Sequence, residues 1–142
     1  MLEDFKVHTK IKLAALWASV MSCYIYADYF GLFSPGQLAT MNRGQIAPLG
    51  QSTDGVMIFV SAMMAVPSLM IFLSVALPAR PNRVLNIICG ALYTAIISLT
   101  MWSGAHFIFY GVIEIALTLL VMFYSWTWPR TDAARRAIED AD

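Results

Sequence analysis

The sequence predicts an all-α, antiparallel four-helix transmembrane bundle. Of the 142 residues, 59% are hydrophobic and 13% are charged, whereas an ordinary soluble domain is about a quarter charged. Most of the apolar residues fall in four runs, which we predict as membrane spans: 13–33, 56–77, 84–102 and 105–126. Each run comes close to the ~20 residues that a helix needs to cross a bilayer.

Helices are expected in these runs because a backbone in lipid must satisfy its hydrogen bonds within its own segment. At this length we expect a single membrane domain, residues 1–142, and the shortage of charge excludes a soluble enzyme. The net charge of zero excludes a basic surface for nucleic acid. Cys23 and Cys89 form neither a CxxC pair nor a cluster with histidine, which excludes a zinc finger and a thioredoxin-like redox pair. No cofactor and no metal site is expected.

The cationic residues predict the orientation of the spans. Arg43 is the single Lys or Arg between the first and second spans, and the connection between the third and fourth has none. The others lie before the first span, between the second and third, or after the fourth: Lys6, Lys10, Lys12, Arg80, Arg83, Arg130, Arg135 and Arg136. Because cationic loops stay in the cytoplasm, we expect a protein of the cytoplasmic (inner) membrane with both termini inside.

The connecting segments predict how the helices are joined. Ser34–Gln37 has the form of a capping box with proline at the first helical position. It predicts a short external helix that continues to about Arg43 and lies on the membrane surface. Pro48 is expected to help end this helix. The segment Pro78–Pro81 predicts a stiff inner turn that is not helical. The polar tail, 130–142, is expected to be a solvated, frayed helix in the cytoplasm.

The two halves of the chain are similar enough to suggest a duplicated helical hairpin. Residues 15–22 resemble residues 91–98, and Pro78 and Pro129 align at the ends of the second and fourth spans. A duplication of this kind relates the halves by an axis along the membrane normal and favours a ligand site between them. The alternative is that two apolar segments match through their composition alone.

Asp28 and Glu114 are the two ionisable residues that lie clearly within the predicted spans. Both fall in the outer half of the membrane, at depths of ~7 Å and ~13 Å from the outer end. An acid costs about 2.5 kcal/mol or more to insert, and no Lys or Arg lies in a span to neutralise either one. Glu114 is therefore a candidate proton acceptor that stays protonated near neutral pH. The alternative is a structural role, in which each acid hydrogen-bonds a neighbouring helix.

Other polar and aromatic residues recur at helical spacing on the same faces as the acids. On the fourth span these residues are His106, Tyr110, Glu114 and Thr118. On the first span they are Trp17, Tyr24 and Asp28. The third span adds a smaller polar face that begins at Asn86, and Pro67 in the second span is expected to free a carbonyl group and kink its helix. The alternative for His106 is an interfacial position without a chemical role.

Several short segments carry a resemblance to a known family. They are Cys23–Leu32, Pro35–Gly36, Pro67–Ser74, Leu85–Ile88 and Trp126–Pro129. Together they are similar to a family of small four-span prokaryotic integral membrane proteins of uncharacterised function. The resemblance implies the four-span architecture and brings no activity or site residue. The small multidrug transporters share this length and span number, but they carry their essential acid in the middle of the first span, whereas Asp28 lies towards its outer end.

Three functions fit these observations. The first is binding or proton-coupled transport of a small cationic or protonatable solute, with Asp28 and Glu114 facing an outward cavity. Three aromatic side chains would line that cavity: Trp17, Tyr24 and Tyr110. A homodimer would complete the path, because four helices enclose little volume. The second is a non-catalytic membrane scaffold or partner subunit, in which the acids only set helix register. The third is a lipid- or quinone-handling enzyme that uses His106 and Glu114, although no nucleophile, metal or cofactor motif accompanies them. The first is preferred.

Overall fold

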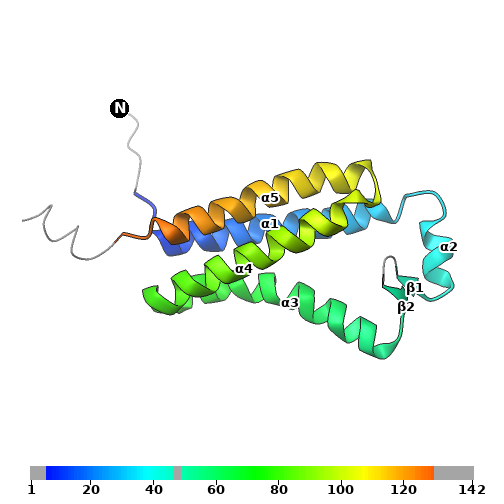
Figure 1. Cartoon of the computed structure of the whole chain (residues 1–142), viewed down its shortest axis with the longest axis horizontal. Helices are drawn as coiled ribbons and strands as arrows, with labels where there is room; N and C mark the ends of the chain where they lie inside the picture. The colour runs from blue at the N-terminus through cyan, green and yellow to red at the C-terminus, as the bar shows by residue number, and fades with distance from the viewer. Residues whose placement is uncertain (1–5, 47–48, 130–142) are drawn as a thin grey trace, which may run out of the picture.

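Helices make up most of the computed structural model, which describes residues 6–46 and 49–129 (Figure 1). Four long helices run back and forth along the molecule: α1 (Thr9–Gly31), α3 (Asp54–Ala76), α4 (Ala79–Thr100) and α5 (Ala105–Trp126). A 3-10 turn, η1 (Met101–Ser103), joins α4 to α5. A short helix, α2 (Gln37–Asn42), and two short strands, β1 (Gln45–Ile46) and β2 (Gly50–Gln51), connect α1 to α3. We call the two ends of the bundle the α2 end and the Pro78 end, the latter after the turn between α3 and α4.

Three of the helices in the described part of the chain are long and apolar enough to cross a membrane. They are α3, α4 with its continuation through η1, and α5, with mean hydropathies of 2.4, 1.9 and 2.1. The first helix, α1, is as long as α3, at 23 residues, but its tyrosines and Asp28 make it less apolar. A largely helical chain with three membrane-capable helices is therefore what the structure contains.

The helix α4 begins at Ala79, so the prediction of a non-helical turn over Pro78–Pro81 is wrong. Only Pro78 lies outside the helix, as its N-cap, and its carbonyl oxygen accepts a hydrogen bond from Asn82 N at 3.1 Å. Pro81 fits inside the first turn because the first N–H groups of a helix have no intrahelical partner. A residue without an N–H therefore loses no hydrogen bond there.

The predicted capping box at the start of the external helix is also wrong. Gly36 is the N-cap of α2, with a left-handed φ of 81° and no side-chain cap. The backbone carbonyl of Ser34, and not its hydroxyl group, accepts a hydrogen bond from Gln37 N at 3.1 Å. The left-handed glycine turns the chain between Ser34 and the helix, which places the serine outside the helical end.

A β-hairpin that the sequence did not predict follows α2. Gln45 pairs with Gln51, and Ile46 pairs with Gly50, in an antiparallel register. Gly44 and Gly50 adopt positive φ angles of 70° and 85°, a conformation that glycine adopts without strain, and they lie on either side of this hairpin's turn. Pro48, like the polar tail 130–142, lies outside the described residues.

The helix α5 packs against both α1 and α4, and α3 packs mainly against α1. These contacts bury a core that is largely apolar: Leu13, Trp17, Val20, Met70, Cys89, Tyr93, Ile97, Met101 and Val121. Gly90 allows α4 and α5 to approach closely, because a Cβ atom at this position would lie 2.8 Å from Met122 Cγ.

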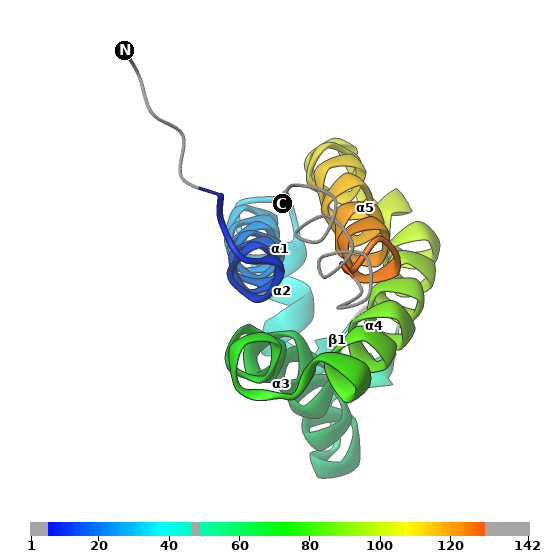
Figure 2. The same ribbon diagram turned by 90° about the vertical axis from the view of Figure 1, so that its left-hand side faces the viewer.

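The packing departs from the two-fold relation that a duplicated hairpin suggests. The two equivalent hairpins, α1 with α3 and α4 with α5, pack comparably, and α1 also packs extensively on α5. The counterpart of this last pair, α3 with α4, makes few contacts, and α3 diverges from the other helices towards its N-terminal half (Figures 1 and 2). The similarity between the halves of the sequence is therefore not repeated in how the helices meet.

Candidate functional site

Glu114 lies on the face of α5 that packs inside the bundle. The buried residues of α5 follow a spacing of three and four residues: Gly111, Glu114, Thr118, Val121 and Ser125. This spacing defines one face of a helix, so the register of α5 places the carboxyl group among buried side chains. Glu114 is 4% exposed, and its Oε1 has no hydrogen-bond partner among the described residues.

The helix α1 faces Glu114 with a tyrosine and an acid. Tyr24 continues the buried face of α1 between Val20 and Ala27, and its hydroxyl group is also buried without a hydrogen-bond partner in the described chain. Asp28 lies one turn further along and is exposed. Glu114 is near enough to Asp28 and to Tyr24 for their charges to interact. The structure thus brings together three of the predicted site residues at the α1–α5 interface.

His106 lies at the α2 end of the same interface. A Cβ atom on Gly31 of α1 would lie 3.6 Å from His106 Nε2, so the imidazole packs where α1 ends. This Nε2 is a third buried atom without a hydrogen-bond partner in the described residues. Buried polar groups are normally paired. Of the four side-chain atoms that are buried without a partner in the described residues, three lie in the half of the α1–α5 interface towards the α2 end, on Tyr24, His106 and Glu114. The fourth, Ser125 Oγ, lies near the C-terminus of α5.

Trp17 and Asn86 belong to a separate group nearer the Pro78 end. Trp17 Nε1 donates to Asn86 Oδ1 at 2.7 Å, and Ser74 Oγ donates to the same oxygen at 3.3 Å. Asn86 Nδ2 donates to the carbonyl and side-chain oxygens of Asn82 at 2.9 and 2.6 Å. Asn82 Nδ2 in turn donates to the carbonyl oxygen of Ser74 at 2.6 Å. These four residues form a buried network that joins α1, α3 and α4.

The partners in this network, Asn82 and Ser74, are absent from the predicted site. The signal that could have found Asn82 is its spacing from Asn86, because two asparagines four residues apart on an apolar helix lie on one face. Trp17 and Asn86 use their hydrogen-bonding groups within the network, and they are not assembled around Glu114.

Tyr93 of α4 lies between the network and the unpaired groups, and sequence reasoning also missed it. Its ring meets Trp17 and Tyr24 edge-on, with centroid distances of 5.9 and 6.4 Å. Its hydroxyl group donates to the carbonyl oxygen of Met63. That carbonyl stands four residues before Pro67, which has no N–H to offer it. Tyr93 therefore supplies from α4 the hydrogen bond that α3 itself lacks.

Thr118 and Tyr110 flank Glu114 on α5 by one turn each. Thr118 Oγ1 lies 2.7 Å from Thr94 Oγ1 of α4 and 3.0 Å from the carbonyl oxygen of Glu114, so it joins α5 to α4. The Tyr110 ring packs edge-on against Phe109 of its own helix, with a centroid distance of 5.5 Å.

Within the described ranges, no three His, Cys, Asp or Glu residues gather into a possible metal-ion site. Asp28, His106 and Glu114 are therefore arranged along an interface and not around a common point. Cys23 and Cys89 are free thiols. What this arrangement offers chemically is a buried carboxyl group on α5 and a buried phenol on the packed face of α1, and no cation of the described residues pairs with the carboxyl group.

Comparison with known proteins gives one match. The model of a family of unknown function, DUF6326, matches residues 2–135. No curated protein and no solved structure matches the chain.

Proposed function

We propose a function from the geometry alone, because the chain belongs to DUF6326, a family of unknown function. In this proposal the protein binds a small cationic or protonatable solute and transports it in exchange for protons. In this proposal α1, α3, α4 and α5 are four membrane spans, and both termini lie in the cytoplasm. Lys10, Lys12, Arg80 and Arg83 all lie at the Pro78 end, whereas Arg43 follows α2 at the opposite end. This distribution supports a cytoplasmic Pro78 end.

The position of α1 supports its inclusion among the spans despite its lower hydropathy. It packs along both α3 and α5, which are apolar enough to cross a membrane. Lys10 Nζ also donates to the carbonyl oxygen of Val75 near the C-terminus of α3, at 3.2 Å. A cation at a helix C-terminus is favourable. The lysine therefore ties the start of α1 to the end of α3 at the Pro78 end.

The observation that carries the proposal is that Glu114 Oε1 and the hydroxyl group of Tyr24, on two helices that pack together, are both buried without a hydrogen-bond partner among the described residues. A carboxylate buried without a partner is costly, so Glu114 requires either a bound proton or a ligand that donates hydrogen bonds and carries positive charge. An ammonium or a protonated amine meets both needs. The phenol of Tyr24 can accept from or donate to the same ligand.

The exchange is balanced as follows. A cation that arrives at the α2 end is attracted first by the exposed carboxylate of Asp28. It displaces the proton of Glu114, which leaves towards the same side, and the site then holds one carboxylate and one cation. The satisfied network of Trp17, Asn86 and Asn82 and the apolar core separate Glu114 from the Pro78 end. Release to the cytoplasm therefore requires this network to open. Glu114 then takes up a proton from the cytoplasmic side, so one proton moves outwards for each cation that moves inwards.

One observation favours the second candidate, a scaffold in which Glu114 only fixes the register of α5. The side chain is 4% exposed, which leaves little room for a solute in this conformation. A scaffold predicts that an uncharged side chain of the same shape serves as well as the acid, whereas the transport proposal requires a group that releases a proton.

The test is proton flux in proteoliposomes across a panel of organic cations. We expect Glu114→Gln to abolish cation-dependent flux without loss of folded yield, since glutamine keeps the shape and cannot exchange a proton. Asp28→Asn should weaken the apparent affinity for the cation. Asp54→Asn is the matched control, because this acid is exposed in the first turn of α3 and should leave flux unchanged. Flux that survives Glu114→Gln, or a folded wild-type protein without flux for any cation, contradicts the proposal.

A further inference from the structure

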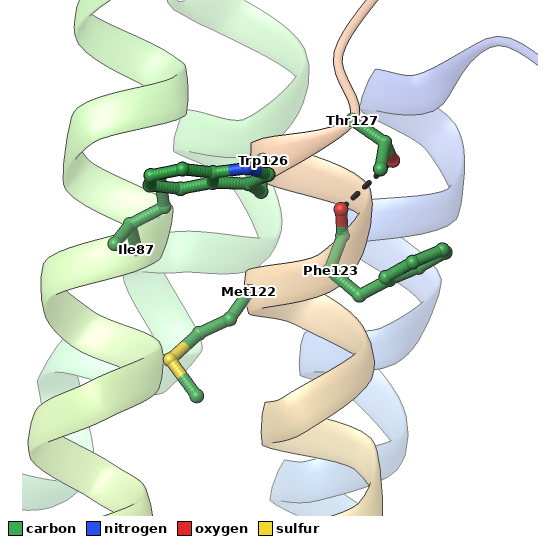
Figure 3. Close-up of a pocket in the computed structure, with 5 residues that line it drawn as sticks. All are labelled: Ile87, Met122, Phe123, Trp126 and Thr127. Atoms are coloured by element: carbon green, nitrogen blue, oxygen red, sulfur yellow. Dashed lines mark hydrogen bonds between the residues drawn. The ribbon is translucent and has the colours of Figure 1, made fainter.

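An open pocket lies between α4 and α5 near the Pro78 end (Figure 3). Its volume is about 310 Å³, and its lining is almost entirely apolar: Ile87, Met122, Phe123, Trp126 and Thr127. In Figure 3 the indole ring of Trp126 extends from α5 towards Ile87 on α4, and the Met122 side chain lies one turn below it. The volume falls at the lower end of the range for ligand-binding pockets.

The shape of the pocket follows from the close packing of the two helices. Met122 packs against Gly90, where a side chain on the glycine would clash with Met122 Cγ at 2.8 Å. Ile87 lies one turn before Gly90 on α4. The hydroxyl group of Thr127 donates its hydrogen to the carbonyl oxygen of Phe123 at 2.8 Å, so this hydrogen is not available to a ligand. The rest of the lining is apolar apart from the indole N–H of Trp126.

A cation stands beside the indole ring. The guanidinium group of Arg83 lies over the ring of Trp126, with Cζ 5.6 Å from the centroid. Arg83 is one turn before Ile87 on α4, so the charge and the apolar wall share one face of the helix. Arg80 lies a further turn towards the helix start and is exposed. The acids in the described ranges, Asp28, Asp54 and Glu114, all lie elsewhere in the bundle.

We propose that this pocket binds an acyl chain of an anionic phospholipid, whose phosphate group contacts Arg83. An apolar slot that opens on the surface of a membrane-capable helix pair is suited to a hydrocarbon chain. A guanidinium group at its edge complements a phosphate, and a tryptophan beside it is typical of the membrane interface. The inference rests on the proposed membrane arrangement, but it does not depend on what binds Glu114.

The test uses the full-length protein in detergent, with bound lipids counted by native mass spectrometry. The probes are phosphatidylglycerol and phosphatidylcholine with identical acyl chains. We expect the wild type to bind the anionic lipid about fivefold more tightly, the effect of one cation near a membrane surface. Arg83→Gln should remove this preference and should weaken the binding of phosphatidylcholine less than that of phosphatidylglycerol, because the choline cation offsets the charge of the phosphate group. Ile87→Trp should weaken both lipids because it fills the pocket, and Ile87→Phe replaces it if the tryptophan variant does not fold.

Lys12→Gln is the matched control. Lys12 lies at the same end of the bundle and also stacks on an aromatic ring, that of Tyr124 at 5.1 Å, but it does not line the pocket. The control should keep the lipid preference. An equal loss in Lys12→Gln and Arg83→Gln indicates diffuse surface charge and overturns the proposal. The absence of any preference in the wild type also overturns it.

Two further outcomes separate this inference from its alternatives. If Ile87→Trp converts a dimer into a monomer and leaves lipid binding unchanged, a second copy of the chain occupies the pocket and the proposal is wrong. Glu114→Gln should keep the wild-type lipid preference, because the acid is not part of the pocket. Loss of cation flux in that variant, together with an intact lipid preference, shows that the two sites succeed or fail independently.

Discussion

Glu114 and Asn86 are both buried polar side chains inside the bundle, but their surroundings differ in one respect. Asn86 donates and accepts hydrogen bonds to Trp17, Ser74 and Asn82. Glu114 Oε1 has no such partner in the part of the chain that the structure describes. A satisfied buried group stabilises a fold, whereas an unsatisfied one costs free energy. A bound proton or a ligand that donates hydrogen bonds would therefore satisfy Glu114, whereas Asn86 already has its partners.

Replacement of Asn86 by alanine should lower the free energy of unfolding by about 1–3 kcal/mol, because it leaves the indole N–H of Trp17 and the side-chain oxygen of Asn82 buried without partners. Thermal or denaturant unfolding of the purified protein, followed by circular dichroism, measures the change. Asn42→Ala is the control, since Asn42 is exposed at the end of α2 and should change stability by less than about 0.5 kcal/mol. Equal effects of the two substitutions would show that the network is not stabilising.

At the scale of the helix, Pro67 explains a contact between α3 and α4. The proline is buried in the middle of α3 and leaves the carbonyl group of Met63 without its usual partner. Tyr93 fills this vacancy from α4. The same tyrosine packs on Trp17 and Tyr24 of α1. The carbonyl group that Pro67 leaves free in α3 therefore forms a hydrogen bond to α4, close to the proposed site.

This relation predicts a coupling between two substitutions. Tyr93→Phe alone should lower the free energy of unfolding by about 1 kcal/mol, because the carbonyl group of Met63 loses its donor. In a Pro67→Ala background, the N–H of residue 67 can bond that carbonyl, so the same Tyr93→Phe change should cost markedly less. A double-mutant cycle measures the difference. Additive effects would mean that Tyr93 acts only through packing, and Tyr26→Phe on the exposed face of α1 serves as the control.

At the scale of the whole molecule, charge and packing are both unevenly distributed. The cations of the described chain lie at the Pro78 end, apart from Arg43, which follows α2. The helix α5 is held between α1 and α4, whereas α3 touches α4 over only a short stretch. The network of Asn82, Asn86 and Ser74 closes that stretch at the Pro78 end. The half of the molecule towards the α2 end is thus the more loosely joined one, and it is the half that contains Glu114.

The proposed orientation predicts which ends can be labelled from outside the cell. In a chain with Cys23 and Cys89 replaced by alanine, Arg43→Cys should react with a membrane-impermeant maleimide in intact cells. Arg80→Cys should react only after the membrane is permeabilised, because cationic connections stay in the cytoplasm. The cysteine-free chain provides the background. The opposite pattern would invert the topology, and reaction of both variants in intact cells would argue against a spanning arrangement.

The sequence predicted four long helices because their signals are local, although the runs 13–33 and 84–102 begin four and five residues after the starts of α1 and α4. The apolar runs 56–77 and 105–126 lie within two residues of α3 and α5. The signals that failed were also local, but ambiguous: proline in a first helical turn and proline in a turn look alike at Pro78–Pro81, and the left-handed turn at Gly36 displaced the expected cap at Ser34. The hairpin of β1 and β2 is too short to leave a periodic pattern.

The candidate site divides in the same way. Helical periodicity alone determined that Glu114, Thr118, Tyr24 and Trp17 lie on the buried faces of their helices. Which of these residues meet was decided by the tertiary structure, because contacts between helices depend on relative depth and rotation, and neither is encoded in the spacing along one helix. The packing of α1, α3 and α4 gave Asn86 its hydrogen-bond partners, and the packing of α1 on α5 left Glu114 Oε1 with none among the residues that the structure describes.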